Sequence, residues 1–149
     1  MLQYFNSKLI TYIEGKHSKD EILKILVDLI KKNSDALKDE DNFYENILAR
    51  EELGSTGIGQ GIAIPHARSE KIEKIVIAIA LLENRVDFSS LDGEDVNLVI
   101  LVGAPKGQNR EYLSLVSQLT RTFRDKNSRE SVTCATNYQE LLEAIAELK

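Results

Sequence analysis

The sequence is poor in the residues that build disulfides and metal sites, with one cysteine and two histidines in 149 residues. The single cysteine, Cys134, cannot form a disulfide within the chain, which fits a reducing compartment. We expect Cys134 to be a small buried residue. With so few histidines and thiols, a metal site of the usual kind lacks an adequate ligand set. No metal is therefore expected.

Long apolar runs and an excess of basic charge are also absent. The longest apolar runs, around residues 75–82 and 98–104, are far shorter than the roughly 20 residues of a membrane-spanning helix. The first residues, MLQYFNSKL, lack a basic region followed by a long apolar one, so no signal peptide is expected. The net charge is -5, with both signs mixed along the chain, whereas nucleic-acid binding favours a basic face. These absences predict a cytoplasmic protein that neither binds nucleic acid nor inserts into a membrane.

No repeat, low-complexity tract or Pro/Ser-rich linker divides the chain. Residues 1–149 are therefore expected to form one domain. A chain of this length buries roughly 68–70% of its unfolded surface, so it can fold without a metal or a disulfide.

Four amphipathic helices are predicted from apolar residues at helical spacing. Ser18 and Glu21 have the spacing of a capping box at the start of the first, the second runs from about Asp41 to Leu53, and Asn109 is expected to cap the third. The expected inward residues are Ile22, Ile25, Leu26, Leu29 and Ile30 in the first helix, Phe43, Tyr44, Ile47 and Leu48 in the second, Leu113, Val116, Leu119 and Phe123 in the third, and Leu141, Leu142, Ile145 and Leu148 in the last.

The predicted strands are rich in β-branched residues. Residues 74–82 and 96–102 are almost continuously apolar, which is typical of strands covered on both faces. A short strand or turn is expected near Leu9–Ile13, and Ile62–Ile64 is strand-like. The expected fold class is α/β: a single-domain sandwich with a mixed, mostly buried β-sheet and helices on both faces.

Residues 57–68, GIGQGIAIPHAR, hold the glycines Gly57, Gly59 and Gly61. They fit only part of the dinucleotide-binding pattern G-x-G-x-x-G, and the residues that follow are strand-like rather than helical. Pro65 also disfavours a helix there. The glycines are better interpreted as conformational freedom, which lets the chain turn tightly and approach either its own sheet or a phosphate.

His66 follows Pro65 at the expected end of a buried strand, where α/β folds often place their sites. The other histidine, His17, lies in a polar segment and is expected to face solvent. No G-x-S-x-G nucleophile elbow is present. A lone histidine is by default a packed or surface residue, and the chemistry open to it is acid–base catalysis or nucleophilic attack. Attack on a phosphoryl group gives a phosphoramidate and needs donors nearby, for which Arg50, Thr56 and Arg68 are candidates.

The run of residues 49–66, AREELGSTGIGQGIAIPH, resembles the active-site signature of the mannitol/fructose-type enzyme IIA domains of the bacterial phosphoenolpyruvate-dependent sugar phosphotransferase system. The family pattern continues with an apolar strand, an Asp-Gly pair, and a second strand that ends in a small residue and proline. Asp92-Gly93, residues 96–102 and Ala104-Pro105 stand in those places. The likeness spans nearly the whole chain.

The resemblance implies a phosphoryl carrier. His66 would accept a phosphoryl group from the phosphocarrier HPr and pass it to a cysteine of an enzyme IIB domain, itself associated with a membrane component, IIC. Arg50 matches the family's active-site arginine and would stabilise the phosphoryl group. Thr56 would orient the imidazole or donate to phosphate, beside the glycines Gly57, Gly59 and Gly61 of a phosphate loop. No cofactor is implied, because the donor and acceptor are both protein side chains.

One position departs from the family pattern. The family usually carries a second histidine at the start of the helix after the Ala-Pro strand end, and Tyr112 holds that place here. A tyrosine can donate a hydrogen bond but cannot carry positive charge near neutral pH. The resemblance extends to the nitrogen-type regulatory enzyme IIA, which acts on target proteins according to its phosphorylation state. A third alternative is a domain that only binds partners.

Overall fold

The computed structural model of the chain describes residues 1–148. Helices form where apolar residues recur three and four positions apart, and strands form where β-branched residues run together. In chain order the elements are η1 (Leu2–Tyr4), η2 (Ser7–Leu9), β1 (Ile10–Ile13), α1 (Lys19–Asn33), α2 (Glu40–Leu53), β2 (Gly57–Gly59), β3 (Ile62–Ala63), β4 (His66–Ser69), β5 (Val76–Val86), β6 (Val96–Pro105), α3 (Asn109–Arg124), α4 (Lys126–Thr133) and α5 (Tyr138–Ala146).

The six strands form one open, mixed sheet. Its order is β1, β5, β6, β3, β2, and β4 pairs with β6 beyond the end of β3. Strand β1 is parallel to β5, while β5 and β6 are antiparallel; β3 and β4 are both parallel to β6. Strand β2 turns back antiparallel on β3. The predicted mixed sheet is confirmed.

The position of strand β5 between two helical layers explains why its sequence is apolar at nearly every position. Val76, Ala78, Ala80 and Leu82 face one hydrophobic cluster, and Ile77, Ile79 and Leu81 face another. Because successive side chains of a strand point to opposite faces, a strand between two helical layers needs apolar residues on both.

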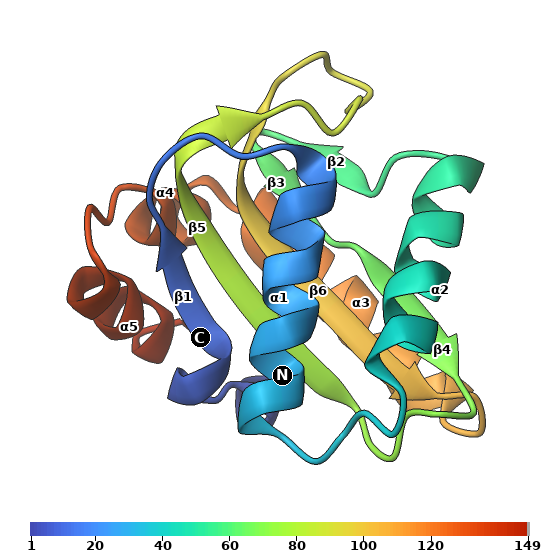
Figure 1. Ribbon diagram of the computed structural model, residues 1–149. Helices are drawn as coiled ribbons and strands as arrows, with labels where there is room; N and C mark the ends of the chain where they lie inside the picture. The colour runs from blue at the N-terminus through green and yellow to red at the C-terminus, as the bar shows by residue number, and fades with distance from the viewer. Residues whose placement is uncertain (149) are drawn as a thin grey trace.

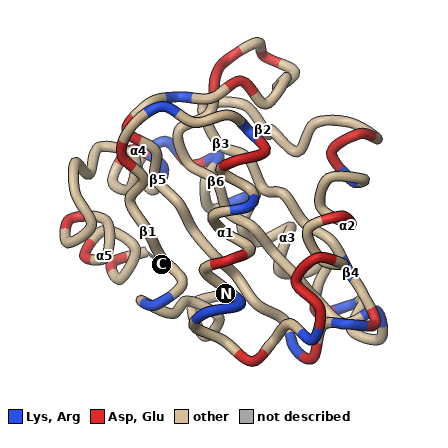
Figure 2. The backbone as a smooth tube through the Cα atoms, viewed as in Figure 1, with Lys and Arg blue, Asp and Glu red and all other residues tan. Residues whose placement is uncertain are grey.

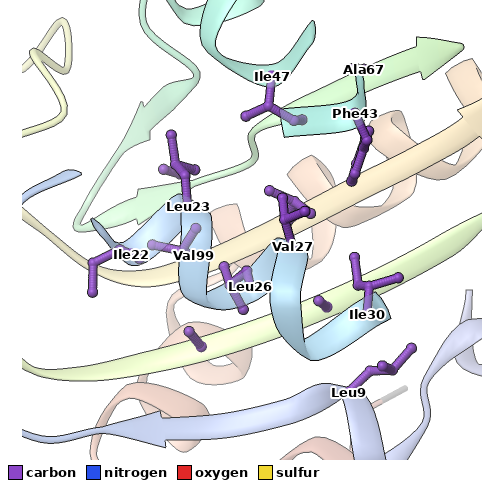
Figure 3. Packing of buried hydrophobic residues seen from close by; sticks show 14 of the residues in the cluster. Leu9, Ile22, Leu23, Leu26, Val27, Ile30, Phe43, Ile47, Ala67 and Val99 are labelled. Carbon is purple, nitrogen blue, oxygen red and sulfur yellow. The ribbon is translucent and has the colours of Figure 1, made fainter. Parts of the chain in front are cut away.

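Helices cover both faces of the sheet, as predicted. Helices α1 and α2 lie on one face, and α3, α4 and α5 lie on the other (Figure 1). Figure 3 shows side chains of α1 and α2 meeting over the sheet, among them Leu26, Val27 and Phe43. Phe43 packs against Gly103 of β6, where a Cβ atom would come within 2.9 Å of its ring. The glycine therefore allows α2 to pack closely on the sheet.

The first helix begins as the sequence predicts. The Glu21 amide donates to the Ser18 hydroxyl over 3.2 Å, and the Ser18 amide donates to the Glu21 carboxylate over 3.0 Å. This capping box satisfies two amide groups that an uncapped helix would leave without partners.

The apolar face of α3 differs from the prediction. Its buried residues are Tyr112, Leu115, Leu119 and Phe123, whereas Leu113 is 63% exposed. Asn109 is the first helical residue, and Gln108 is the N-cap without a side-chain cap hydrogen bond. The stripe begins one residue earlier than expected, because Tyr112 rather than Leu113 shares a face with Leu115 and Leu119. Leu113 is thereby turned outward beside the sheet edge.

Two expectations near the C-terminus also need correction. The last helix ends at Ala146, so Leu148 is buried just beyond it rather than within it. Cys134 is exposed at the C-cap of α4, and Val132 is the buried residue of that helix. The aliphatic residue takes the apolar position and the thiol is left in solvent.

The strand that leads to His66 is interrupted. Strand β3 ends at Ala63, and β4 begins at His66, with Ile64 and Pro65 between them. Proline has no N–H to donate to a ladder, although the Pro65 carbonyl still accepts from the Val102 amide over 2.9 Å. His66 therefore follows the end of the buried strand β3, as predicted, and also starts a further strand, β4, that was not predicted.

Among the helices that the structure describes, none combines the length and the apolar character needed to cross a membrane. Basic and acidic residues are interspersed along the chain in the view of Figure 2 rather than separated into two faces.

Candidate functional site

His66 lies where the sheet acquires a free edge. Strand β4 pairs with β6 on one side, and no described strand pairs with its other side. The His66 Nδ1 atom lies 2.7 Å from the Ile64 carbonyl oxygen. A carbonyl can only accept, so Nδ1 carries the hydrogen and Nε2 keeps its lone pair. The fold thus selects the tautomer in which Nε2 is the nucleophilic atom.

Beside His66 is an open hollow of about 900 Å³, lined by residues of α2, β4 and α3. Its cationic residues are Arg50, Arg68 and Lys106, and Glu52 is its acidic residue. The full lining comprises Asn46, Ala49, Arg50, Glu52, Leu53, His66, Ala67, Arg68, Lys106, Asn109, Tyr112 and Leu113. The excess of positive charge in an acidic protein suits an anionic group.

Arg50 comes from the last turn of α2. Its Nη1 donates to the Gly54 carbonyl over 2.8 Å, which folds the side chain back over the end of its own helix. Arg50 forms no ion pair with any carboxylate of residues 1–148. The structure therefore brings Arg50 to the hollow beside His66. The remaining N–H groups of its guanidinium are free to donate to a ligand.

Thr56 lies behind the hollow rather than in its lining. Its hydroxyl donates to Glu51 Oε2 over 2.5 Å, and Glu51 Oε1 pairs with Lys19 Nζ over 2.7 Å. Lys19 also lies over the Phe88 ring, 5.0 Å from its centroid. The Thr56 hydroxyl therefore hydrogen-bonds to Glu51 inside the protein. The sequence had predicted a contact with the imidazole or with phosphate instead.

The Lys19–Glu51–Thr56 network fixes the end of α2 that carries Arg50. The Glu51 side chain is 5% exposed, and removing one partner of a buried charge leaves the other without compensation. The sequence alone does not identify Glu51 as part of this network, because its ion-pair partner, Lys19, lies in another helix. The position of Glu51 next to Arg50, within the signature run of residues 49–66, is the one sequence signal that points to it.

Thr56→Val should destabilise the protein. It deletes a donor to a buried carboxylate while keeping the side-chain volume, and such charged hydrogen bonds contribute about 1.5–3 kcal/mol. Thr56→Ser is the matched control, because it keeps the hydroxyl and loses only a methyl group, at about 0.8 kcal/mol. Urea unfolding measures both. A valine variant no less stable than the serine variant would show that the network contributes nothing.

The glycines of the signature shape a hairpin away from the hollow. Gly59 and Gly61 have φ of +91° and +82°, values that side chains disfavour. The Gln60 amide between them donates to Asp92 over 2.9 Å. At Gly57 a Cβ would come within 2.0 Å of Ser90 Oγ. None of the three lines the hollow, so the predicted phosphate loop is corrected to a tight turn at the far end of β3.

Tyr112 and Arg68 stand together next to His66. The Tyr112 and His66 ring centroids are 5.8 Å apart, with an interplanar angle of 56°. The Arg68 guanidinium carbon lies 5.3 Å from the Tyr112 ring centroid. Burial raises the pKa of Tyr112, so its phenol stays protonated. The sequence named His66, Arg50, Arg68 and Tyr112 for this site, and the structure adds Lys106 and the exposed Leu53 and Leu113.

Burial lowers the pKa of His66 below its usual 6.5, and the charges of Arg50 and Arg68 lower it further. The hydrogen bond to Ile64 and the Glu51 carboxylate oppose the decrease. The imidazole is therefore neutral near pH 7, with its Nε2 lone pair available for attack.

A proton NMR titration should place the His66 midpoint below 6.5, with the signal assigned from its loss in His66→Gln. Because the pKa of His66 is higher in the unfolded chain, the imidazole takes up a proton more readily there. The His66 contribution should therefore lower the free energy of unfolding as pH falls below 6.5. The contribution is constant above that pH. A midpoint at or above 6.5 would contradict the buried, cation-flanked environment.

Chemically, the site offers a neutral nucleophile flanked by fixed cations. No group of His, Cys, Asp and Glu residues within 1–148 is arranged to hold a metal ion. Such a site is suited to attack on an anionic, electrophilic group whose charge the guanidiniums can share.

Similar proteins cover nearly the whole chain. The family model for “Phosphoenolpyruvate-dependent sugar phosphotransferase system, EIIA 2” matches residues 3–148. A nitrogen regulatory protein of Pseudomonas aeruginosa is 31% identical over 132 residues, 89% of this chain and 85% of that protein. The fructose-specific EIIABC component of Bacillus subtilis is 33% identical over 133 residues, 89% of this chain but only 21% of that longer protein.

A solved structure supports the same relationship. The nitrogen regulatory protein IIA-Ntr from Neisseria meningitidis matches this fold with a TM-score of 0.83 and 26% sequence identity, over 97% of each chain.

Proposed function

The chain belongs to the EIIA 2 family of the phosphoenolpyruvate-dependent sugar phosphotransferase system, and on this premise we propose that it carries a phosphoryl group on Nε2 of His66. The observation that carries the proposal is the 2.7 Å contact of His66 Nδ1 with the Ile64 carbonyl. It leaves Nε2 unprotonated in a hollow that also holds Arg50 and Arg68.

In the proposed reaction, the Nε2 lone pair attacks phosphorus, and the bond from phosphorus to the donor breaks with its electron pair leaving on the donor. The product ring carries phosphoryl at Nε2 and the original hydrogen at Nδ1. The Ile64 carbonyl stabilises this protonated ring. A protonated imidazole is also the better leaving group when the phosphoryl group moves on, so the same contact serves both half-reactions.

Arg50 is proposed to stabilise the transferring group. During phosphoryl transfer, negative charge spreads over the three equatorial oxygens and is stabilised by hydrogen-bond donors held in fixed positions. A guanidinium can donate to two of these oxygens at once. The backbone contact to Gly54 uses one donor direction of Arg50 and holds the remainder near His66.

HPr is the proposed donor and a cysteine of enzyme IIB the proposed acceptor. The similar EIIABC component of Bacillus subtilis joins the IIA, IIB and IIC designations in one protein, which supports an acceptor of this class. Leu53 and Leu113 are 86% and 63% exposed on opposite rims of the hollow. Exposed apolar side chains around charged residues are typical of surfaces that dock other proteins. The proposed reactions take place in the cytoplasm, with IIC reached through IIB.

A regulatory role is the second candidate. The nitrogen regulatory protein of Pseudomonas aeruginosa and IIA-Ntr of Neisseria meningitidis are similar over most of the chain. In this alternative, His66 is phosphorylated in the same way, but the phosphoryl group controls the binding of a target protein.

Incubation with phosphoenolpyruvate, enzyme I and HPr, followed by addition of a fructose- or mannitol-type IIB, tests these proposals in order. An acid-labile mass increase of about 80 Da, that of one phosphoryl group, is expected at His66 before IIB is added. Its loss to IIB supports the sugar carrier, and its retention supports the regulatory role. A chain that takes up no phosphoryl group contradicts both. Sugar permease genes beside the coding sequence would favour the carrier.

A further inference from the structure

Arg68 shares a face of β4 with His66. Their pairing partners in β6, Val102 and Ala104, belong to the cluster on the α3 side of the sheet, whereas Ala67 between them belongs to the opposite cluster. Two residues along a strand span roughly 6.6 Å. Strand geometry therefore places the guanidinium side chain and the imidazole on the same side of the free edge.

The Tyr112 ring lies against both of these side chains. It is 5% exposed and fixed within the first turns of α3. Its centroid is 5.8 Å from that of His66, and the Arg68 guanidinium carbon is 5.3 Å from it. A cation above an aromatic face is attracted without using its N–H donors, so the ring can hold Arg68 while leaving the guanidinium edge free.

Arg68 has no competing partner in the described part of the chain. No carboxylate of residues 1–148 forms an ion pair with it, and its side chain makes no hydrogen bond there. Arg50, by comparison, is tied to Gly54 on the α2 side of the hollow. The two guanidiniums thus approach His66 from different elements.

We propose that Arg68 is a second phosphoryl-binding residue, and that Tyr112 positions it by stacking rather than by its hydroxyl. This inference rests on the proposed function of His66. A phosphoryl group on Nε2 brings close to two negative charges into the hollow, and Arg50 compensates one of them. Arg68 supplies the other positive charge. The tyrosine at a position where the family pattern carries a histidine then acts through its ring.

The test measures single-turnover transfer from phosphorylated HPr in five variants. Arg68→Gln should slow transfer about 10- to 100-fold, the equivalent of one charged hydrogen bond or two, and Arg68→Lys should recover part of the rate. Tyr112→Phe keeps the platform and should transfer at close to the parent rate. Tyr112→Leu removes the platform and should approach the Arg68→Gln rate. Arg121→Gln, on an exposed part of α3, is the charge-matched control.

The double variant Tyr112→Leu/Arg68→Gln tests the coupling. If Tyr112 acts through Arg68, the double variant transfers no more slowly than Arg68→Gln alone. The proposal would be overturned if the rate losses of the two single variants multiplied in the double variant. A Tyr112→Phe variant with slow transfer, or an Arg68→Gln variant with transfer at the parent rate, would overturn it as well. Thermal melts of the leucine variants separate a loss of folding from a loss of positioning.

A second measurement is independent of phosphoryl transfer. The NMR titration midpoint of His66 should rise in Arg68→Gln, because a nearby positive charge has been removed, and stay unchanged in Arg121→Gln. The charged groups that face His66 are Arg50 and Glu51 from α2 and Arg68 from β4. An unchanged midpoint in Arg68→Gln would refute the placement of Arg68. A parent protein that takes up no phosphoryl group would instead refute the proposed function.

Discussion

Replacing His66 by alanine is expected to abolish phosphorylation by HPr. The hollow has no second imidazole in its lining, and loss of a nucleophilic side chain commonly costs on the order of 10⁴-fold or more in rate. Folding should survive, since the ring is only half-buried and one hydrogen bond to Ile64 is lost, worth about 1 kcal/mol. Mass spectrometry after incubation with phosphoenolpyruvate, enzyme I and HPr measures the effect.

His17→Ala is the matched control. His17 contacts the Glu14 carbonyl before α1 and is absent from the lining of the hollow. It should be phosphorylated at the parent rate. If His66→Ala still acquired one phosphoryl group, the acceptor would have to be a different residue.

Arg50→Gln should reduce the rate of transfer by about 100- to 1000-fold, comparable with the removal of one preorganised donor from a charged transition state. Because the guanidinium should stabilise the transferring phosphoryl group more strongly in the transition state than in the bound complex, the single-turnover rate should fall more than the affinity for HPr. Arg50→Lys should fall between the parent and Arg50→Gln, since an ammonium lacks the planar fork of donors.

The control for Arg50 must separate catalysis from the stability of the α2 terminus. Arg50→Gln also removes the contact with Gly54, so urea unfolding should accompany the kinetics. Arg121→Gln provides the same charge change on an exposed face of α3. Equal transfer rates for Arg50→Gln and Arg121→Gln would remove Arg50 from the site.

The local sequence predicts the parts of the fold that depend on neighbouring residues. The capping box of Ser18 and Glu21 and the two-faced strand β5 were both predictable, because each depends on side-chain spacing within one element. The register of α3 was not, since Tyr112 and Leu113 are both apolar enough to face a core. Packing against the sheet selects Tyr112 and leaves Leu113 exposed.

The sequence predicts the position of the candidate nucleophile, His66, better than it predicts the groups that hold that residue in place. The Pro65-His66 pair pointed to a histidine on rigid backbone, but the hydrogen bond to Ile64 that sets its tautomer depends on the break between β3 and β4. Thr56 was expected to orient the imidazole or to donate to phosphate. Its hydroxyl instead meets Glu51, whose other oxygen pairs with Lys19 of a different helix, and no local pattern records a contact of that kind.

His66 is proposed to accept the phosphoryl group on Nε2, because Nδ1 is held by the Ile64 carbonyl. NMR of the phosphorylated protein with ¹⁵N-labelled histidine tests it most directly, through the coupling between ³¹P and each ring nitrogen. We expect coupling to Nε2 of His66, with the Nδ1 hydrogen retained. Coupling to Nδ1, or a phosphoryl group on any other residue, would contradict it.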